Sequence, residues 1–173
     1  MVDYLLTNEE TERLLFRKVT TDDFKDWLPF HENPLSNQYW NGLPADPKIA
    51  CQQQLGKTLQ RYNEGSGGLN SLICKKDHQL IGLCGLLVQE IEGQRELEIG
   101  YSILPEFWRQ GYAFEAANLC KQIAFDKEWA ESLICIIHHE NIPSQKTALK
   151  LGMSVDFTTS YFNNPVDIYR IYK

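Results

Sequence analysis

The sequence lacks several features that mark large classes of protein. With 17 Lys and Arg against 23 Asp and Glu, the formal net charge is −6, whereas a nucleic-acid-binding chain needs a basic face. No apolar run approaches the roughly 20 residues of a membrane-spanning helix. The first ten residues, MVDYLLTNEE, have no basic start and only a short apolar patch, so they do not predict a signal peptide. We therefore expect neither nucleic acid nor a membrane as a partner.

Cysteine-based and nucleotide-binding motifs are also missing. The five cysteines are odd in number and form no C-x-x-C pair, which favours free thiols in a reducing, cytoplasmic compartment. Neither G-x-G-x-x-G nor G-x-S-x-G occurs. The LGKT segment at 55–58 has Cys51 where a phosphate loop needs glycine. His138 and His139 are adjacent in a predicted strand, where side chains alternate between faces, so we expect no metal site.

The chain does contain an ordered series of strand and helix patterns. Its 173 residues, 43% of them hydrophobic, fit one domain over residues 1–173. The expected strands cover residues 13–19, 69–76, 79–89, 96–103, 132–140, 153–162 and 166–173. The expected helices cover residues 20–30, 48–62, 111–129 and 143–152. Hairpins combined with β-α-β crossovers predict a fold between the α+β and α/β classes, with a mixed sheet and helices on both faces.

The segment PEFWRQGYAFEA, residues 105–116, joins a predicted strand to a predicted helix. Pro105 ends the strand ladder, and Gly111 lets the backbone turn into the helix. Unpaired N–H groups and the helix dipole make such a helix start an anion site, and Arg109 adds a positive charge. The alternative interpretation is an ordinary connection with a surface arginine.

A second polar segment, ENIPSQKTALKLGM, follows the next predicted strand. Asn141 comes directly after that strand, and Ser144 lies three residues further on. The carboxamide of Asn141 can donate and accept hydrogen bonds, which suits an amide-rich ligand lying between two strand ends. Taken alone, Asn141 fits a helix cap better than a ligand group. The two segments together, at this separation, are more specific than either one.

On these segments the sequence resembles the GNAT superfamily of acyl-CoA-dependent N-acyltransferases, and within it the Rim-type branch that acetylates ribosomal-protein N-termini. The resemblance covers nearly the whole chain, including TERLLFRKVTTDDFKDW, LEIGYSILPEFWRQGYAFEA and ENIPSQKTALKLGM. It implies a mostly antiparallel mixed sheet with a splay between the fourth and fifth strands. It also implies acetyl-CoA as cosubstrate and an amine as acceptor, in a monomer or homodimer.

The resemblance also assigns residues to the cosubstrate. The family's R/Q-x-x-G-x-G/A loop falls on residues 108–113, with Trp108 in place of the usual Arg or Gln. Backbone amides of this loop would hold the CoA pyrophosphate, while the preceding strand and Asn141 would contact the pantetheine arm. The implied cofactor-binding residues are Tyr101, Ser102, Ile103, Arg109, Gln110, Gly111, Tyr112, Ala113, Asn141 and Ser144.

Acetyl transfer needs an unprotonated amine, a donor for the oxygen of the tetrahedral intermediate and a route for the leaving thiolate. Glu98 is the candidate base, because it shares a face with Ser102 in an apolar strand. The alternative is a rim carboxylate paired with Arg95 or a lysine. Many family members carry a tyrosine where this chain has Ala148. Ser144 is therefore the candidate for the acid role, and a nearby tyrosine, water or unassisted departure are its alternatives.

The acceptor pocket is expected between residues 27–41 and the last hairpin. Asn37 and Trp40 are the candidate substrate-binding residues, since they suit a partly apolar pocket with amide contacts. The alternative is a loop whose aromatic rings fill the core. A protein N-terminus, a small amine and an amino sugar all stay open as acceptors. The sequence also leaves two alternatives to an acetyltransferase, namely a catalytically weak module that binds CoA and a structural protein that binds no cofactor.

Overall fold

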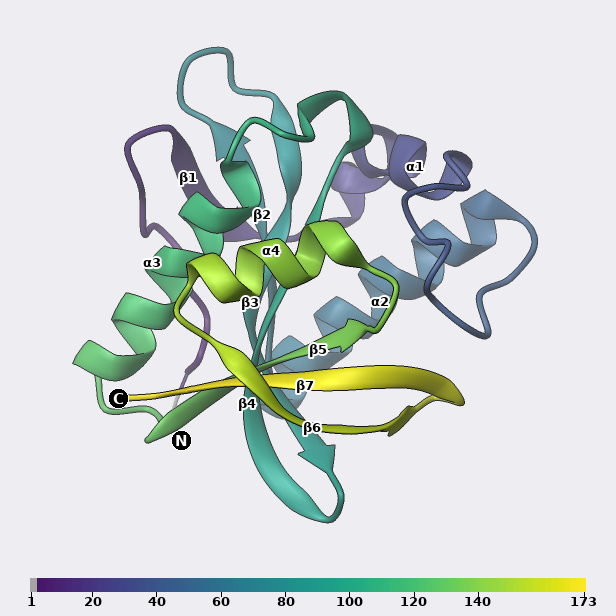
Figure 1. Cartoon of the computed structure of the whole chain (residues 1–173). Helices are drawn as coiled ribbons and strands as arrows, with labels where there is room; N and C mark the ends of the chain where they lie inside the picture. The colour runs from purple at the N-terminus through teal and green to yellow at the C-terminus, as the bar shows by residue number, and fades with distance from the viewer. Residues whose placement is uncertain (1–2) are drawn as a thin grey trace.

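Seven strands form a single sheet in the computed structural model, which describes residues 3–173 (Figure 1). The spatial order is β1-β2-β3-β4-β5-β7-β6, and every neighbouring pair is antiparallel except β4 and β5. The strands are β1 (Leu14–Lys18), β2 (Gly67–Cys74), β3 (Leu80–Ile91), β4 (Gln94–Ile103), β5 (Ser132–His138), β6 (Ser154–Tyr161) and β7 (Asn164–Tyr172). The mixed, mostly antiparallel sheet expected from the sequence is confirmed.

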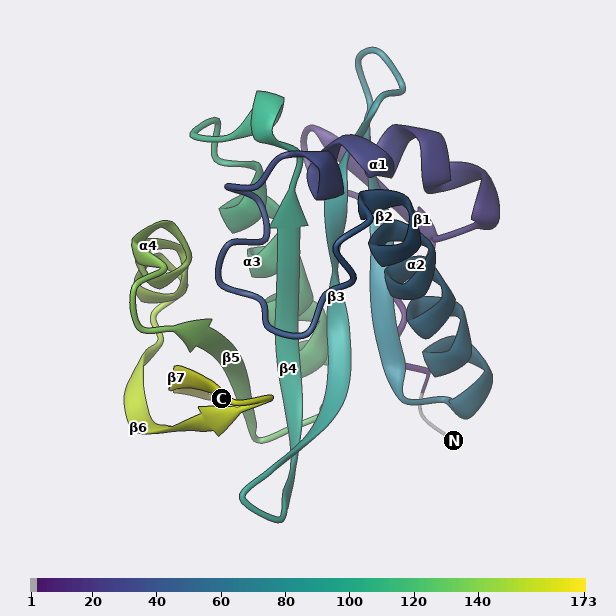
Figure 2. The same cartoon turned by 90° about the vertical axis from the view of Figure 1, so that its right-hand side faces the viewer.

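Helices cover both faces of this sheet (Figure 2). α1 (Phe24–Glu32) and α2 (Pro47–Glu64) lie over one face, and α3 (Tyr112–Asp126) and α4 (Ile142–Lys150) lie over the other. Strand alternation divides the core between them. Leu83 packs with α1 and α2, whereas its neighbour Cys84 packs with α3. None of the helices within residues 3–173 has the length and apolar composition that a membrane span requires.

The parallel strands β4 and β5 meet at one position and then separate. Glu98 pairs with Ile134, and one residue further on the Cys135 thiol donates to the carbonyl of Ile99 across 3.3 Å. Beyond these contacts the carboxyl ends of the two strands lie apart, as their arrowheads in Figure 2 show. The splay expected between the fourth and fifth strands is therefore present, and Glu98 lies at its fork.

Several element ends differ from the sequence expectation. α3 stops at Asp126 rather than near Trp129, because Glu128 takes a left-handed φ of 55° that a helix cannot continue through. The first helix starts with a 3₁₀ turn at Thr21–Asp23 and extends to Glu32. The last hairpin turns at Phe162 and Asn163, both with positive φ, so its turn begins one residue before the expected Asn-Asn-Pro segment.

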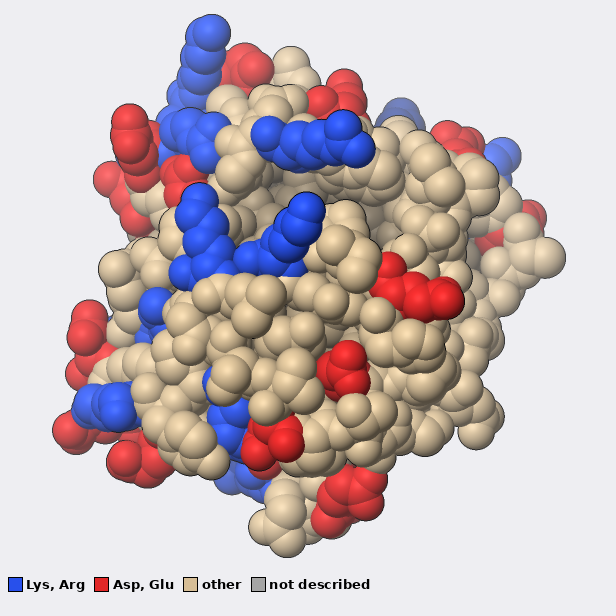
Figure 3. Space-filling model, viewed as in Figure 1, with Lys and Arg blue, Asp and Glu red and all other residues tan. Residues whose placement is uncertain are grey.

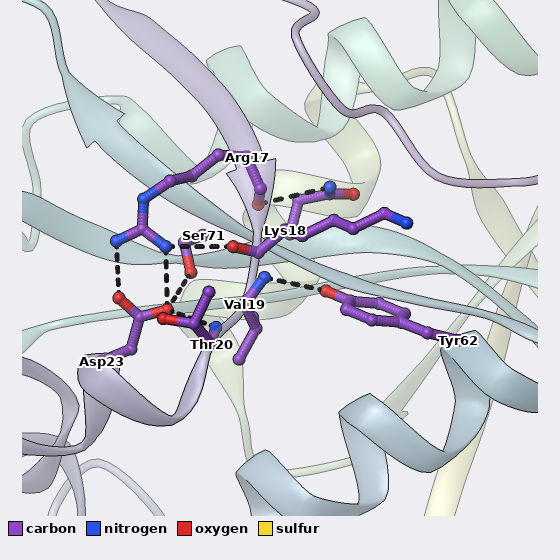
Figure 4. Close-up of polar contacts among 8 residues, drawn as sticks. Arg17, Lys18, Val19, Thr20, Asp23, Tyr62 and Ser71 are labelled. Atoms are coloured by element: carbon purple, nitrogen blue, oxygen red, sulfur yellow. Dashed lines mark hydrogen bonds and ion pairs between the residues drawn. The ribbon is translucent and has the colours of Figure 1, made fainter.

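A buried carboxylate joins β1, α1 and β2 (Figure 4). Asp23 is 2% exposed, and Arg17 donates to both of its oxygens, at 2.5 and 2.9 Å. The Ser71 hydroxyl and the Thr20 N–H each donate to it at 2.9 Å. Burial alone would raise the pKa of Asp23, but these donors together lower it. The cluster fixes the start of α1, from which the loop over the sheet departs.

Candidate active site

The loop between β4 and α3 is held in place by its own side chains and by two left-handed residues. The Trp108 indole donates to the carbonyl of Ile103 at 2.7 Å, and the Gln110 amide donates to that of Glu106 at 3.1 Å. Arg109 has a φ of 60° and Gly111 a φ of 81°. Gly111 is the N-cap of α3, as its position in the sequence predicts.

Free N–H groups line this loop. Among residues 3–173, no hydrogen-bond acceptor meets the backbone N–H groups of residues 109–113. They lie at the start of a 15-residue helix, where the dipole adds partial positive charge. Consecutive free N–H groups at a helix start form a site for an anion such as a phosphate. The structure therefore gives the predicted loop the geometry that anion binding needs.

Arg13, in the segment before β1, contacts both the loop and the start of α3. Arg13 donates to the carbonyl of Gln110 at 3.0 Å and places its guanidinium carbon 4.1 Å from the centre of the Tyr112 ring. Its side chain also pairs with Glu115, in the first turn of α3. A cavity of about 430 Å³ lies beside these residues, between the segment before β1 and α3. Arg13 was not predicted as a site residue, because no local pattern in the sequence marks it.

Positive side chains stand on both sides of a hollow at this end of the sheet. Figure 3 shows Lys and Arg side chains over α4 and, across the hollow, over the loop after β4. The exposed cations of these segments are Lys146 and Lys150 on α4 and Arg109 in the loop. On a chain with a net charge of −6, this local excess of positive charge favours an anionic ligand.

Asn141, Ser144 and Tyr101 come together where β5 runs into α4. Asn141 caps α4, since its Oδ1 accepts from the N–H of Ser144 at 3.3 Å. Tyr101 reaches across from β4, and its hydroxyl donates to the carbonyl of Ser144 at 3.0 Å. Burial raises the pKa of Tyr101 well above its usual range, so the phenol stays protonated. The sequence placed all three residues in one site, and the structure brings them together.

Glu98 lies partly buried at the fork of β4 and β5, with a partner that the sequence did not suggest. The Gln89 amide donates to Oε2 of Glu98 at 2.6 Å. Arg95, the partner that the alternative interpretation expected, points instead to the Tyr4 hydroxyl. Burial raises the pKa of Glu98, while Gln89 and the charge of Arg61 partly oppose that rise. A carboxylate of this kind holds a proton more readily than an exposed glutamate.

Asn37 and Trp40 line a second cavity, of about 420 Å³, together with His31 and Glu32. The loop that carries them reaches the last hairpin, because Asn164 donates to the carbonyl of Tyr39 at 2.8 Å. Trp40 is 37% exposed, so its ring does not fill the core. The loop therefore meets the last hairpin, but no residue of that hairpin lines this cavity. Among residues 3–173, Glu32 is the one charged residue in the lining.

The tautomer of His31 follows from its neighbours. The Trp27 indole, which only donates, gives its hydrogen to Oε1 of Gln54 at 2.6 Å. The same oxygen lies 2.7 Å from Nε2 of His31, so Nε2 carries the proton. Nδ1 of His31 is then an acceptor, and it is buried without a partner among residues 3–173. Burial lowers the pKa of His31, which keeps the ring neutral.

The two adjacent histidines do not follow the alternation expected of them. The rings of His138 and His139 stack with centroids 4.6 Å apart, because β5 ends at His138 and side-chain alternation ends with it. His139 is exposed, with Nδ1 3.4 Å from the carbonyl of Pro165. In the part of the chain that the structure describes, no three His, Cys, Asp or Glu side chains gather as a metal site.

Comparison with known proteins identifies the class to which this fold and site belong. The family model described as "Acetyltransferase (GNAT) domain" matches residues 13–154, and the chain belongs to this acetyltransferase family. The Bacillus subtilis (strain 168) protein described as "Uncharacterized protein YkkB" is 33% identical over 133 residues, which are 76% of this chain and 75% of that one.

Two solved structures show the same fold. The acetyltransferase from Agrobacterium tumefaciens str. C58 superposes with a TM-score of 0.81 at 20% identity, covering 100% of this chain and 98% of that one. The ribosomal L7/L12 α-N-protein acetyltransferase RimL, solved with coenzyme A, gives 0.72 at 13% identity, with 95% and 97% covered. These two structures show the fold, and the family match over residues 13–154 agrees with the enzyme class expected from the sequence, an N-acetyltransferase.

Proposed function

We propose that this enzyme moves acetyl from acetyl-CoA to a primary amine by direct attack in a ternary complex, as a member of the Rim-type branch. The observation that carries the proposal is the row of free N–H groups at residues 109–113, placed at a helix start beside two parted strands. A pyrophosphate needs several donors at once, and this loop offers them without rearranging a side chain. The RimL structure with coenzyme A supports the same assignment by fold.

The cosubstrate would extend from this loop along β4. Within the described chain, residues 100–103 have hydrogen-bonded partners on β3 but none on β5. Of these residues, Tyr101 and Ile103 turn their backbone groups toward β5, because strand residues alternate and the N–H of Leu104 donates to Ile81 of β3. The Ile103 carbonyl already accepts from Trp108, so the other backbone groups of Tyr101 and Ile103 are available to an amide-rich pantetheine arm. Asn141 and Ser144 close the other side of the gap. The exposed cations Arg109, Lys146 and Lys150 supply positive charge for the phosphate group of CoA that is not part of the pyrophosphate.

The amine would reach the carbonyl carbon near the fork, where Glu98 lies. An alkyl ammonium with a pKa of about 10.4 must lose a proton before it attacks, whereas an α-amine with a pKa of about 7.7–8.0 is already partly neutral. The carboxylate of Glu98 accepts that proton, directly or through water. A backbone N–H of β4 then donates to the oxygen of the tetrahedral intermediate. The acceptor is a protein N-terminus or a small amine that lies against Asn37 and Trp40.

The leaving thiolate has few partners in this site. Ala148, at the position of the family's tyrosine, is buried in the core cluster with 0% exposure. The Tyr101 hydroxyl is already engaged by the carbonyl of Ser144. The hydroxyl of Ser144 is the remaining side-chain candidate for the acid. This sparse set also supports a second function, a catalytically weak module that binds CoA.

Two measurements separate these functions. Thermal unfolding is followed with acetyl-CoA at concentrations up to millimolar. A free acetyl-CoA concentration of 100 times its Kd stabilises the folded state by about 2.7 kcal/mol. Release of free CoA thiol is then screened across alkyl amines, amino sugars and N-terminal peptides. We expect stabilisation together with thiol release for at least one amine. Stabilisation by acetyl-CoA without release of thiol would favour the catalytically weak module. No stabilisation at all would contradict both functions.

A further inference from the structure

Two carboxylates on the same face of β4 have different partners. Glu96 is bound in bidentate fashion by Arg170 of β7, with N–O distances of 2.8 and 2.9 Å. Glu98, two residues on, has no such direct ion pair among residues 3–173. Its partner is the neutral amide of Gln89, which lies opposite Glu96 in the β3–β4 ladder and therefore faces the same side.

The orientation of the Gln89 amide is fixed by two donors. Nη2 of Arg61, from α2, donates to Oε1 of Gln89 at 3.1 Å. The Tyr161 hydroxyl, at the end of β6, also lies 3.3 Å from this oxygen and donates to it. A guanidinium can only donate, so the atom facing it must be the amide oxygen. The NH₂ group of Gln89 therefore faces Glu98, which accepts from it at 2.6 Å.

Arg61 is itself anchored. Nη1 of Arg61 donates to the carbonyls of Ser66 at 3.2 Å and Val88 at 3.0 Å. The guanidinium is thus held one amide away from Glu98 rather than against it. A directly paired arginine typically lowers a carboxyl pKa by about 1–3 units, which would weaken the group as a base. An interposed amide holds the carboxylate in place while sparing most of its basicity.

We propose that Gln89 is a positioning residue for Glu98, oriented by Arg61 and Tyr161, which holds one carboxylate oxygen so that the other takes the proton of the acceptor amine. This inference rests on the proposed function, in which Glu98 is the base. The four residues come from α2, β3, β4 and β6. The hairpin that contacts the acceptor loop therefore also contacts Gln89, the partner of the base, through Tyr161.

The charges around Glu98 set the direction of the expected change. Arg61 and Gln89 lower the pKa of Glu98, and burial raises it. The charge of Glu98 also acts on three other titratable groups, which are Tyr101 on β4, Cys135 on β5 and Tyr161 on β6. Burial raises the pKa of each of them and keeps it in its neutral form. Loss of the Gln89 donor removes a stabilising contact of the charged form, so the pKa of Glu98 rises.

The test is a titration of Glu98 in the whole protein with Gln89→Met. The carboxyl ¹³C signal of Glu98 is assigned by its loss in Glu98→Gln, and its pKa is compared between wild type and variant. We expect a rise of about one pH unit, the scale of one hydrogen bond to a charged group. The acid limb of kcat/KM, measured with the best amine from the thiol-release screen, moves by the same amount. Gln60→Met, an exposed change beside Arg61 in α2, leaves both quantities unchanged.

Each other outcome has a definite meaning. An unchanged Glu98 titration in Gln89→Met overturns the inference and leaves acetyl transfer standing. A shifted titration with an unshifted acid limb overturns both the inference and the role of Glu98 as base. If Gln89→Met does not fold by circular dichroism, Arg61→Met replaces it. That variant keeps the amide, removes its anchor and should raise the Glu98 pKa in the same direction.

Discussion

Nη2 of Arg13 lies 2.6 Å from Oε2 of Glu115 and joins the residue before β1 to the first turn of α3. Glu115 also accepts the Thr11 hydroxyl at 2.5 Å and the Arg13 N–H at 2.9 Å. Burial alone would raise the pKa of Glu115, but these three donors together lower it. A carboxylate thus stays ionised one turn from the proposed phosphate site, where it would repel the ligand without the arginine beside it.

Replacement of Arg13 should therefore weaken CoA binding. In Arg13→Gln the Glu115 charge loses its partner and the Gln110 carbonyl loses its donor. We expect about a tenfold rise in the Kd for CoA, or about 1.4 kcal/mol, by isothermal calorimetry. Lys75→Met, which removes an exposed cation paired with Glu10 at 3.2 Å, serves as the control. An equal loss in both variants would point to overall charge rather than to this contact.

Substitution of Gly111 tests whether CoA binding depends on the backbone conformation of the loop. Among residues 3–173, a Cβ at Gly111 would meet only Nη2 of Arg13, at 3.5 Å, so space is available, but the φ of 81° disfavours any other residue. We expect Gly111→Ala to lose about 1–2 kcal/mol of unfolding free energy through that conformation, and to bind CoA more weakly. Gly93 has a similar φ of 75°, and no atom in the described part of the chain lies within 4 Å of a Cβ placed there, so Gly93→Ala is the control. It should lose similar stability in urea titrations and keep its CoA affinity.

The ion pair between Arg17 and the buried Asp23 should contribute to stability (Figure 4). The Arg17 side chain is 37% exposed, and Ser71 and Thr20 still donate to Asp23 without it, so loss of Arg17 costs about 1–2 kcal/mol rather than the cost of an uncompensated buried charge. We expect Arg17→Met to lose this amount in urea unfolding at pH 7. The pKa of Asp23 is lowered on folding, so its contribution is present above the unfolded value of about 3.9 and lost as pH falls through the folded value. The gap between variant and wild type should therefore narrow at acid pH.

Local features of the site could be predicted from the sequence, and its long-range pairs could not. The loop at residues 105–113 and the Asn141 cap depend on positions a few residues apart, and both were predicted. The partner of Glu98 could not be predicted, because it depends on hairpin register and on side chains far along the chain. Gln89 lies 28 residues from Arg61 and 72 from Tyr161. Arg13 and Glu115 are 102 residues apart, so only the fold brings them together.

The neutral state of the buried His31 predicts that the free energy of unfolding decreases at acid pH. Its pKa is lowered on folding, chiefly by burial, because a proton on Nδ1 would have no acceptor among residues 3–173. The unfolded chain therefore binds a proton that the folded chain does not. Stability is unaffected well above the unfolded value of about 6.5 and falls as pH drops from there toward the folded value. One proton sets a maximum slope of about 1.4 kcal/mol per pH unit.

Urea unfolding between pH 8 and pH 5 measures this slope. His31→Gln cannot titrate, and it can still donate toward Oε1 of Gln54, to which His31 and Trp27 both donate in wild type. We expect the variant to lose the His31 part of the acid slope while its m-value stays the same. His78→Gln, an exposed change in the turn between β2 and β3, should keep the slope of wild type. Equal slopes in wild type and His31→Gln would show that the buried ring does not control stability in this pH range.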